Sequence, residues 1–401
     1  MSRGGALRRD GIAVLSVGMA LLALMLFTGC WPTRPNAYNS YLLQACAWLD
    51  GHLDLGRDYP HLELAIYGGR YYVSFPPFPS YVLLPFAALF GERTPDLAIA
   101  LGITLIGVIY AGRLYRRTAG DDDGLYWVLF LYLGTGFLFV ALNGYVWFLA
   151  QTMCFTLSLM ALYYAGEGRG GAALALWACA VGCRPMTALY LPVLLYLLWR
   201  RRPPRMGLKA MLQTRWYWGL GPLLIGGSYM VLNSLRFGSV LEFGYNYLPE
   251  FTRAENGQFS AAYLAENVKN LLRLPVWTGD GSPVSFYSFD GMAFWLVDPL
   301  VFPLAGAWIA GLLRRGREER FLLIALPVLS AGYGLLLCLH RTLGGWQFGN
   351  RYLLDLLPWL FCGLCRWKPP APWFREASVP FAVFGTALNL IGTAALYSGW
   401  I

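Results

Sequence analysis

Long apolar segments alternate with short polar ones along most of the 401 residues. Many apolar segments run for about 17–25 residues, the length that an α-helix needs to cross a bilayer. Only helices and closed barrels satisfy their backbone hydrogen bonds in lipid, and the sequence lacks the short alternating segments of barrel strands. The pattern therefore predicts an all-α polytopic membrane protein. About eleven transmembrane helices are expected, at 11–31, 95–113, 124–142, 146–165, 171–184, 187–200, 216–235, 294–313, 321–339, 351–366 and 378–398.

The apolar segment 78–90 differs from these because it is short and rich in proline. We predict that it is an interfacial helix, which lies along the membrane surface rather than crossing it. With the N-terminus in the cytoplasm, this assignment places most of the 31 Lys and Arg residues in cytoplasmic segments. Such an excess is expected of cytoplasmic loops. If 78–90 crossed the membrane, Arg113, Arg116 and Arg117 would move outside and the bias would weaken.

The same layout places two long polar loops, 32–75 and 236–293, on the external face. We therefore expect residues 1–401 to form a single transmembrane domain whose chemistry is extracytoplasmic. An alternative for the first apolar segment is a signal peptide, because Phe27-Thr-Gly-Cys30 resembles a weak lipoprotein cleavage site. The length of that segment and the many spans that follow favour an uncleaved helix.

Composition supports a membrane protein and excludes several function classes. The chain is 57% hydrophobic and 13% charged, whereas soluble domains carry about 25% charged residues. The net charge of +9 is typical of basic loops that face anionic lipid, and the sequence has no basic stripe for nucleic acid. Cys362 and Cys365 form a C-x-x-C within an apolar segment, where packing is the expected role. We predict no cofactor, and the sequence does not indicate a divalent metal.

The first external loop carries the candidate catalytic acids, Asp58 and Glu63. A carboxylate at a membrane surface, flanked by aromatic residues, is a good candidate for a general base because a drier setting raises its basicity. Glu63 lies between Leu62 and Leu64, which predicts a partly buried side chain. Ordinary solvation is the alternative for either acid. The neighbouring residues His61, Tyr71 and Tyr72 are expected to line the same pocket.

Several basic residues on the external face are candidates for binding a phosphate group. Arg70 follows Gly68-Gly69, and either a bound phosphate or an ion pair with Glu63 would explain it. Arg184 is a lone arginine between two short spans. Lys269, in the second external loop, is a weaker candidate.

A glycine-rich turn at 344–350 leads into the predicted helix that contains Arg351 and Asp355. A helix N-terminus attracts anions, so Arg351 is a candidate phosphate ligand, with an ion pair to Asp355 as the structural alternative. An ionisable residue inside a span is a functional candidate, so we include Asp355 in the pocket. His340 is predicted to face the same external side.

Five segments resemble those of the GT-C superfamily of integral-membrane glycosyltransferases: 41–51, 62–72, Phe75-Pro-Pro-Phe-Pro-Ser80, 236–245 and Phe348-Gly-Asn-Arg-Tyr-Leu-Leu-Asp355. Within that superfamily, the layout resembles bacterial relatives of protein O-mannosyltransferases and lipid A aminoarabinose transferases. The resemblance implies a polyprenyl-phosphate sugar donor, an acid that deprotonates the acceptor hydroxyl, and attack with inversion. Basic residues, with Arg351 and Arg70 first, would stabilise the phosphate leaving group.

The sequence departs from the family pattern just after the first span, where those enzymes often carry an acid. Here Asn36 and Asn39 occupy that neighbourhood. Either Glu63 or Asp58 then supplies the carboxylate, or the chain is a non-catalytic membrane scaffold. A transporter or flippase of lipid-linked sugars is a further alternative, although its charges would be expected at mid-membrane. The acceptor would be a glycan, lipid or protein, and composition favours a bacterial inner membrane.

Overall fold

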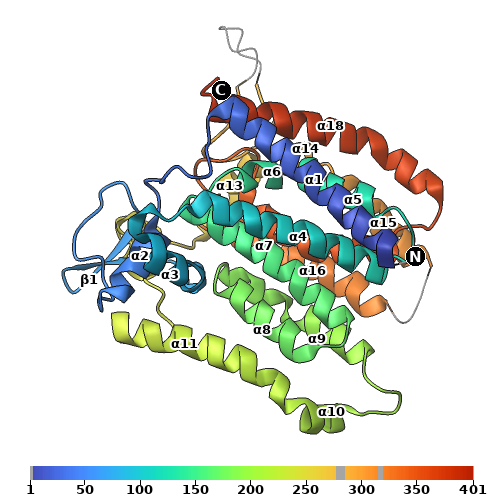
Figure 1. The fold of residues 1–401 in the computed structure, drawn as a ribbon, viewed down its shortest axis with the longest axis horizontal. Coiled ribbons are helices and arrows are strands. Elements are labelled where there is room, and N and C mark those ends of the chain that lie inside the picture. The colour runs from blue at the N-terminus through green and yellow to red at the C-terminus, as the bar shows by residue number, and fades with distance from the viewer. Residues whose placement is uncertain (1–2, 277–284, 315–318, 401) are drawn as a thin grey trace. The chain divides into compact units, whose positions relative to one another are not determined.

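The computed structural model describes residues 3–276, 285–314 and 319–400, and its secondary structure is mostly helical (Figure 1). The chain divides into two compact units, each described by itself below. The loop unit comprises Pro32–Ile103 and Asn143–Ser260. The terminal unit comprises Met1–Trp31, Thr104–Leu142 and Ala261–Ile401. Helix α4 (Asp96–Thr118) belongs to both units, since the division falls within it.

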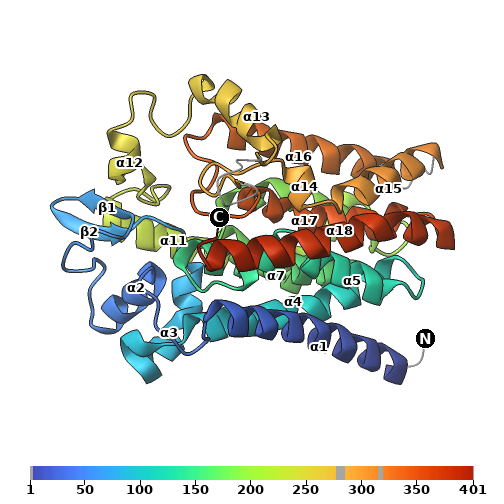
Figure 2. The same cartoon turned by 90° about the horizontal axis from the view of Figure 1, so that it is seen from above.

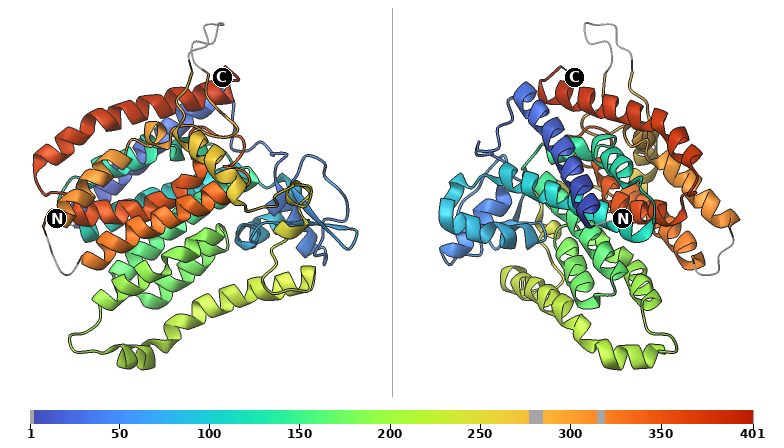
Figure 3. Two further views of the ribbon diagram at one scale, coloured as in Figure 1. Left: turned by 180° about the vertical axis from the view of Figure 1, so that it is seen from behind. Right: turned by 45° about the vertical axis from the view of Figure 1, so that its right-hand side comes forward.

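The loop unit is built around the long apolar helix α7, against which α8 packs; α8 also contacts α11 (Figures 1 and 3). In the most apolar 18 residues of α7, 78% of the residues are buried. This is expected of a helix that is apolar on all sides. Helix α11 instead exposes Leu223, Leu224 and Val231, which suits a face toward lipid. The elements of this unit are α2 (Ser40–Leu49), β1 (Leu64–Tyr67), β2 (Arg70–Val73), α3 (Phe78–Phe90), η1 (Gly91–Arg93), α7 (Val146–Gly166), α8 (Gly170–Val181), η2 (Pro185–Tyr190), α9 (Leu191–Arg200), α10 (Leu208–Arg215), η3 (Trp216–Gly219), α11 (Leu220–Phe237), η4 (Tyr245–Tyr247) and α12 (Pro249–Thr252).

The loop 32–75, which was predicted to be external, contains a β-hairpin that the all-α prediction did not include. Strands β1 and β2 pair antiparallel, with Leu64 opposite Val73, and β2 contacts α2 (Figure 2). Gly68 and Gly69 form the turn with φ angles of +58° and +74°. Positive φ at both central residues is what a two-residue hairpin turn requires. The hairpin fixes the path of the chain on either side of Glu63 and Arg70.

The terminal unit packs α1 and α18 against α5, and α15 against α17. Helix α1 exposes Leu15, Met19 and Leu22, which again suits contact with lipid. The elements of this unit are α1 (Arg3–Thr28), α5 (Gly124–Leu133), α6 (Phe137–Ala141), η5 (Ala261–Tyr263), α13 (Leu264–Leu272), α14 (Phe294–Val297), α15 (Val301–Leu313), α16 (Arg320–Leu339), η6 (Arg351–Leu356), α17 (Leu357–Trp367) and α18 (Pro372–Tyr397).

The span predicted at 124–142 is broken into α5 and α6. The hydroxyl of Thr135 donates to the carbonyl of Leu131 at 2.7 Å, and the amide of Gly136 donates to the buried carboxylate of Asp298 at 2.9 Å. These hydrogen bonds satisfy backbone groups that the break would otherwise leave unpaired. Asp298 therefore has a structural role that the sequence did not indicate.

The helices agree well in position with the predicted spans. Fewer than eleven of them, however, are long enough to cross a membrane as a single helix. Five helices of the described chain are long and apolar enough to cross a membrane: Leu7–Thr28, Asp96–Thr118, Val146–Gly166, Arg320–Leu339 and Pro372–Tyr397. The other predicted spans are shorter or interrupted helices, so the count of eleven stays a prediction. The predicted interfacial segment 78–90 coincides with α3. The protein is a multi-pass helical membrane protein.

Candidate functional site

A polar site in the loop unit joins the loop 32–75 to the start of α7. We call it the loop site and define it by its side chains: Asn36, Tyr38, His61, Glu63, Asp96 and Trp147. The indole nitrogen of Trp147 donates a hydrogen bond to Oε2 of Glu63 at 3.1 Å. The ring of Tyr38 lies 5.6 Å from that of Trp147 and 5.9 Å from that of His61. A predicted catalytic acid is thus held in an aromatic setting.

The backbone around Tyr38 is tied down on two sides. The amide of Val146 donates to the carbonyl of Tyr38 at 3.0 Å. Nε2 of His61 lies 3.0 Å from the carbonyl oxygen of Ala37, to which it donates in the matching tautomer. The segment 37–38 is therefore fixed between the chain before β1 and the first turn of α7. The predicted pocket residue His61 is exposed and contacts the segment 37–38, and its role in a pocket stays a prediction.

A second carboxylate of the loop site, Asp96, was missed by the sequence reasoning. Asp96 begins α4, is 2% exposed, and accepts hydrogen bonds from the backbone amide of Leu97 at 2.8 Å and from the side-chain amide of Asn36. The same amide group of Asn36 lies 3.3 Å from the carbonyl of Gly144. A Cβ added at Gly144 would lie 2.6 Å from the backbone nitrogen of Leu97. Glycine at 144 therefore permits the close approach that brings these segments together.

The two acids that were predicted from the sequence differ in their surroundings. Glu63 is exposed, so the expectation of a partly buried side chain was wrong: Leu62 and Leu64 are buried while Glu63 points away from them. Alternation of side chains along an extended segment explains this outcome. Asp58 is also exposed and lies on the open part of the loop.

Arg70 forms an ion pair with Asp54 at 3.3 Å, with 67% of its side chain exposed, rather than the alternative pair with Glu63. Asp54 also accepts a hydrogen bond from the amide of Gly56 at 2.9 Å. Of the predicted pocket tyrosines, Tyr71 is half-buried, whereas Tyr72 is buried with its ring 5.3 Å from that of Phe237. Tyr72 therefore belongs to the packing of the hairpin.

Arg184 is half-buried at the turn between α8 and η2, in the same unit as Glu63. It lies close enough to Tyr41 to influence its ionisation. Burial raises the pKa of the Tyr41 phenol well above its ordinary value, and the positive charge of Arg184 opposes that shift. Arg184 thus places a cation near α2.

The remaining predicted site residues lie in the terminal unit. Arg351 is 3% exposed; its Nε donates to the carbonyl of Gly344 at 2.9 Å, and its backbone amide donates to Oε1 of Gln347 at 2.9 Å. Asp355 is also buried and accepts a hydrogen bond from the hydroxyl of Tyr333 at 2.9 Å. Arg351 was predicted to lie at the start of a helix; it begins the 3₁₀ turn η6, which leads into α17, and its hydrogen bond to Gly344 braces the glycine-rich segment.

The last two predicted residues have local partners. Nδ1 of His340 lies 2.8 Å from the carbonyl of Thr342, at the end of α16. Lys269 is 72% exposed and lies 3.8 Å from Glu266 one turn earlier in α13. In the described ranges no group of three or more His, Cys, Asp or Glu side chains is placed to hold a metal ion. Cys362 and Cys365 are both buried in α17, in keeping with packing.

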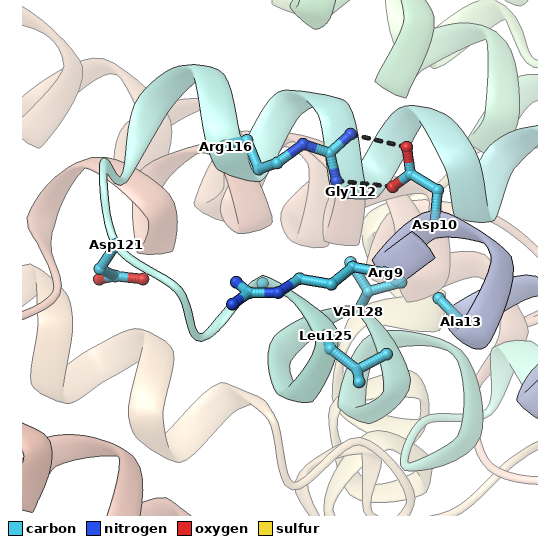
Figure 4. A pocket seen from close by; sticks show the side chains of 9 residues that line it. Arg9, Asp10, Ala13, Gly112, Arg116, Asp121, Leu125 and Val128 are labelled. Carbon is cyan, nitrogen blue, oxygen red and sulfur yellow. Dashed lines mark hydrogen bonds and ion pairs between the residues drawn. The ribbon is translucent and has the colours of Figure 1, made fainter. Parts of the chain in front are cut away.

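The terminal unit also holds a pocket lined by charged residues near the start of α1 (Figure 4). Two nitrogens of Arg116 donate to the two carboxylate oxygens of Asp10 at 2.6 and 2.7 Å. Arg9 pairs with Asp122 at 2.7 Å, and the buried Lys368 pairs with Asp121. We call these residues, together with the Arg375–Asp123 pair at 2.8 Å, the ion-pair network. Its charges satisfy one another, which indicates a structural role.

Comparison with solved structures identifies the fold. The chain superposes on ArnT from Cupriavidus metallidurans bound to undecaprenyl phosphate with a TM-score of 0.53 and 16% identity, covering 97% of this chain and 75% of that one. It superposes on the Archaeoglobus fulgidus oligosaccharyltransferase in the apo form with a TM-score of 0.55 and 12% identity. That match covers 99% of this chain but only 56% of the oligosaccharyltransferase.

No family model and no curated protein matches the sequence. At 12–16% identity the structural likeness shows the fold. The chain shares its fold with ArnT and with the oligosaccharyltransferase, and this likeness confirms the resemblance that was stated from the five sequence segments.

Proposed function

We propose that this protein is an inverting membrane glycosyltransferase that moves a sugar from a polyprenyl-phosphate donor to an acceptor hydroxyl on the external face of the membrane. The observation that carries the proposal is the fold, which the chain shares over 97% of its length with ArnT bound to undecaprenyl phosphate. The loop site adds a carboxylate in an aromatic setting on a surface loop. Such a site suits a reaction between a lipid-borne donor and an acceptor that arrives from water.

Glu63 is the general base in this proposal. Its carboxylate takes the proton of the acceptor hydroxyl while the acceptor oxygen attacks the anomeric carbon of the donor. The bond between that carbon and the phosphate oxygen breaks, and its electron pair leaves with the polyprenyl phosphate. Exposure of Glu63 suits this role because the acceptor must reach it. The hydrogen bond from Trp147 would keep the carboxylate oriented. Asp58 is the second candidate.

The leaving phosphate requires a cation to stabilise its charge. We propose Arg184 as the first candidate for this role. It belongs to the same unit as Glu63 and is half-buried near Tyr41, and its planar fork suits phosphate oxygens. Arg70 is exposed and could turn from Asp54 toward a ligand. Arg351 and Lys269 stay predictions for the same role, to be tested by their own substitutions. We propose no metal for the reaction.

We further propose a bacterial inner membrane location with the N-terminus in the cytoplasm and the two long loops outside. The distribution of basic residues supports this orientation. Cysteine labelling of an introduced residue in the hairpin turn, from outside intact cells, tests it. Labelling only after permeabilisation would contradict it.

Transfer by the purified protein tests the function. A panel of radiolabelled polyprenyl-phosphate monosaccharides is incubated with the protein, and released polyprenyl phosphate and transferred sugar are both measured. We expect turnover of at least one donor. Export of intact donor across a vesicle membrane without cleavage would instead identify a flippase. If folded protein shows neither transfer nor export of the donor, the proposal is refuted and the protein is better described as a non-catalytic membrane scaffold.

A further inference from the structure

We propose that Asn36 and Asp96 form a subsite that binds a sugar hydroxyl, in which buried Asp96 orients the amide of Asn36 and Oδ1 of Asn36 accepts the hydrogen bond. This inference deepens the proposed function and depends on it for the identity of the ligand as a sugar. Asp96 is a positioning residue here, since it acts through Asn36.

The first observation is the absence of a positive partner. Within the part of the chain that the structure describes, no cation lies within 4.0 Å of the buried carboxylate of Asp96. Its hydrogen-bond donors are the Asn36 amide and the backbone of Leu97. A buried charge held only by neutral donors is costly to a fold. Such groups occur preferentially at functional sites.

The second observation is the orientation of Asn36. Both neighbours of its nitrogen, the carboxylate of Asp96 and the carbonyl of Gly144, are acceptors. The NH₂ group must therefore face them, which directs Oδ1 the other way. Among the described residues, Oδ1 of Asn36 is buried and has no hydrogen-bond partner. A buried acceptor without a donor is rare and calls for a ligand or water.

Hydrogen-bonding capacity identifies the kind of ligand. The unpartnered atom of the subsite, Oδ1 of Asn36, is an acceptor, which favours an O–H donor over the acceptor oxygens of a phosphate. Tyr38 lies two residues along from Asn36, and its ring packs near those of Tyr145 and Trp147 at 5.2 and 5.6 Å. Aromatic walls with a few placed polar groups are typical of small-molecule sites. A sugar offers both the apolar ring face and the hydroxyls.

Binding of short-chain prenyl-phosphate monosaccharides tests the subsite. Wild type is compared with Asp96→Asn across a series in which each sugar hydroxyl is removed in turn, with prenyl phosphate alone as the reference. In the variant, the new side-chain amide at position 96 faces the amide of Asn36. Because an amide can donate or accept, it no longer forces the NH₂ group of Asn36 toward position 96. We expect one hydroxyl whose removal weakens wild-type binding about tenfold, and we expect that difference to vanish in Asp96→Asn. Affinity for prenyl phosphate itself should not change.

Kinetics and stability separate positioning from packing. Where transfer is measured, Asp96→Asn should raise the KM for the donor about tenfold and change kcat less than threefold. The unliganded variant should melt at the same temperature as wild type or higher, because a buried charge is removed. Glu92→Gln, which changes an exposed acid in the same segment, is the matched control for all readouts.

The outcomes distinguish this inference from the proposed function. Active wild type with unchanged hydroxyl discrimination in Asp96→Asn would overturn the subsite and leave the function standing. Sugar binding that depends on Asp96, without transfer, would refute the function and support the subsite. A melting temperature several degrees lower for Asp96→Asn would assign Asp96 to packing and overturn the subsite. If prenyl-phosphate monosaccharides bind no more tightly than prenyl phosphate alone, the subsite is overturned as well.

Discussion

The loop site and the ion-pair network use the same residue types in opposite ways. In the ion-pair network, each of Asp121, Asp122 and Asp123 has a cationic partner, as does Asp10. In the loop site, Asp96 is held by an amide and a backbone N–H, and Glu63 accepts from an indole. Acids that are paired with cations hold elements together. A buried acid that has only neutral donors, as Asp96 has among the described residues, is costly to the fold. Such groups occur preferentially at functional sites.

This difference separates residues that should matter for stability from those that should matter for activity. Removing one partner of a buried ion pair leaves an uncompensated charge and destabilises the fold. Neutralising a carboxylate of the loop site is expected to change ligand binding or transfer more than it changes stability. The following substitutions test that separation, from the largest expected effect to the smallest.

Glu63→Gln should lower kcat for transfer by about 10²–10⁴-fold, because an amide cannot accept the acceptor's proton. Its melting temperature should stay at the wild-type value, since the indole of Trp147 can still donate to the amide oxygen. Asp58→Asn, an exposed acid in the same loop, is the matched control and should retain activity. Full activity in Glu63→Gln would exclude Glu63 as the base, and loss in Asp58→Asn alone would transfer the role to Asp58.

Lys368→Met should lower the free energy of unfolding by about 3 kcal/mol. Its side chain is 4% exposed and pairs with Asp121 and Asp123, so its loss removes the cation that Asp121 pairs with. Arg375→Met removes a cation that is 43% exposed, and it should cost less than about 1 kcal/mol. Equilibrium unfolding in detergent measures both. Equal losses in the two variants would show that burial of the cation does not decide how much its ion pair contributes to the free energy of unfolding.

Trp147→Phe should lower kcat/KM by about fivefold to tenfold, the loss expected for one hydrogen bond of about 1 kcal/mol. The aromatic contact with Tyr38 is kept, so only the donor to Glu63 is removed. The effect should disappear in a Glu63→Gln background, because the orientation of Glu63 no longer matters there. An additive effect in that background would show that Trp147 acts independently of Glu63.

Stability should fall with acid in a way that depends on Asp121. Burial alone would raise the pKa of Asp121, but hydrogen bonds from Lys368 and Tyr115 outweigh it and hold the pKa below its ordinary value. Its contribution is therefore complete above the unfolded pKa of about 4 and is lost as pH falls through the lower folded pKa. Melting temperatures between pH 5 and pH 3 should fall less steeply in Asp121→Asn than in wild type. Parallel curves would contradict this linkage.

Much of the fold could be predicted from local pattern. Pro77 before and Gly91 after an apolar run set the bounds of α3, which agree with the predicted 78–90. The hairpin was also predictable, since Gly68-Gly69 is a two-residue turn signal that lies between Tyr67 and Arg70-Tyr71-Tyr72. The break at Gly134 was harder to predict because it depends on Asp298, which lies 162 residues from Gly136 in sequence.

The site was predicted less well because its contacts are long-range. Asp96 meets Asn36 across 60 residues of sequence, and Glu63 meets Trp147 across 84. Local composition says nothing about such pairs. An asparagine where an acid was expected led to Glu63 and Asp58 as substitutes, but not to the carboxylate that lies against Asn36. The contact of Arg351 with Gly344 could not be predicted for a related reason: Gly344 belongs to a turn whose shape the sequence pattern did not specify.

The most direct measurement is the anomeric configuration of the transferred sugar, read by proton NMR, alongside mass spectrometry of the lipid product. Wild type given a β-linked polyprenyl-phosphate sugar should release polyprenyl phosphate and form an α-linked product. Glu63→Gln should form at most about a hundredth as much. A β-linked product would contradict inversion by direct attack, and cleavage that is unchanged in Glu63→Gln would contradict a loop carboxylate as the base.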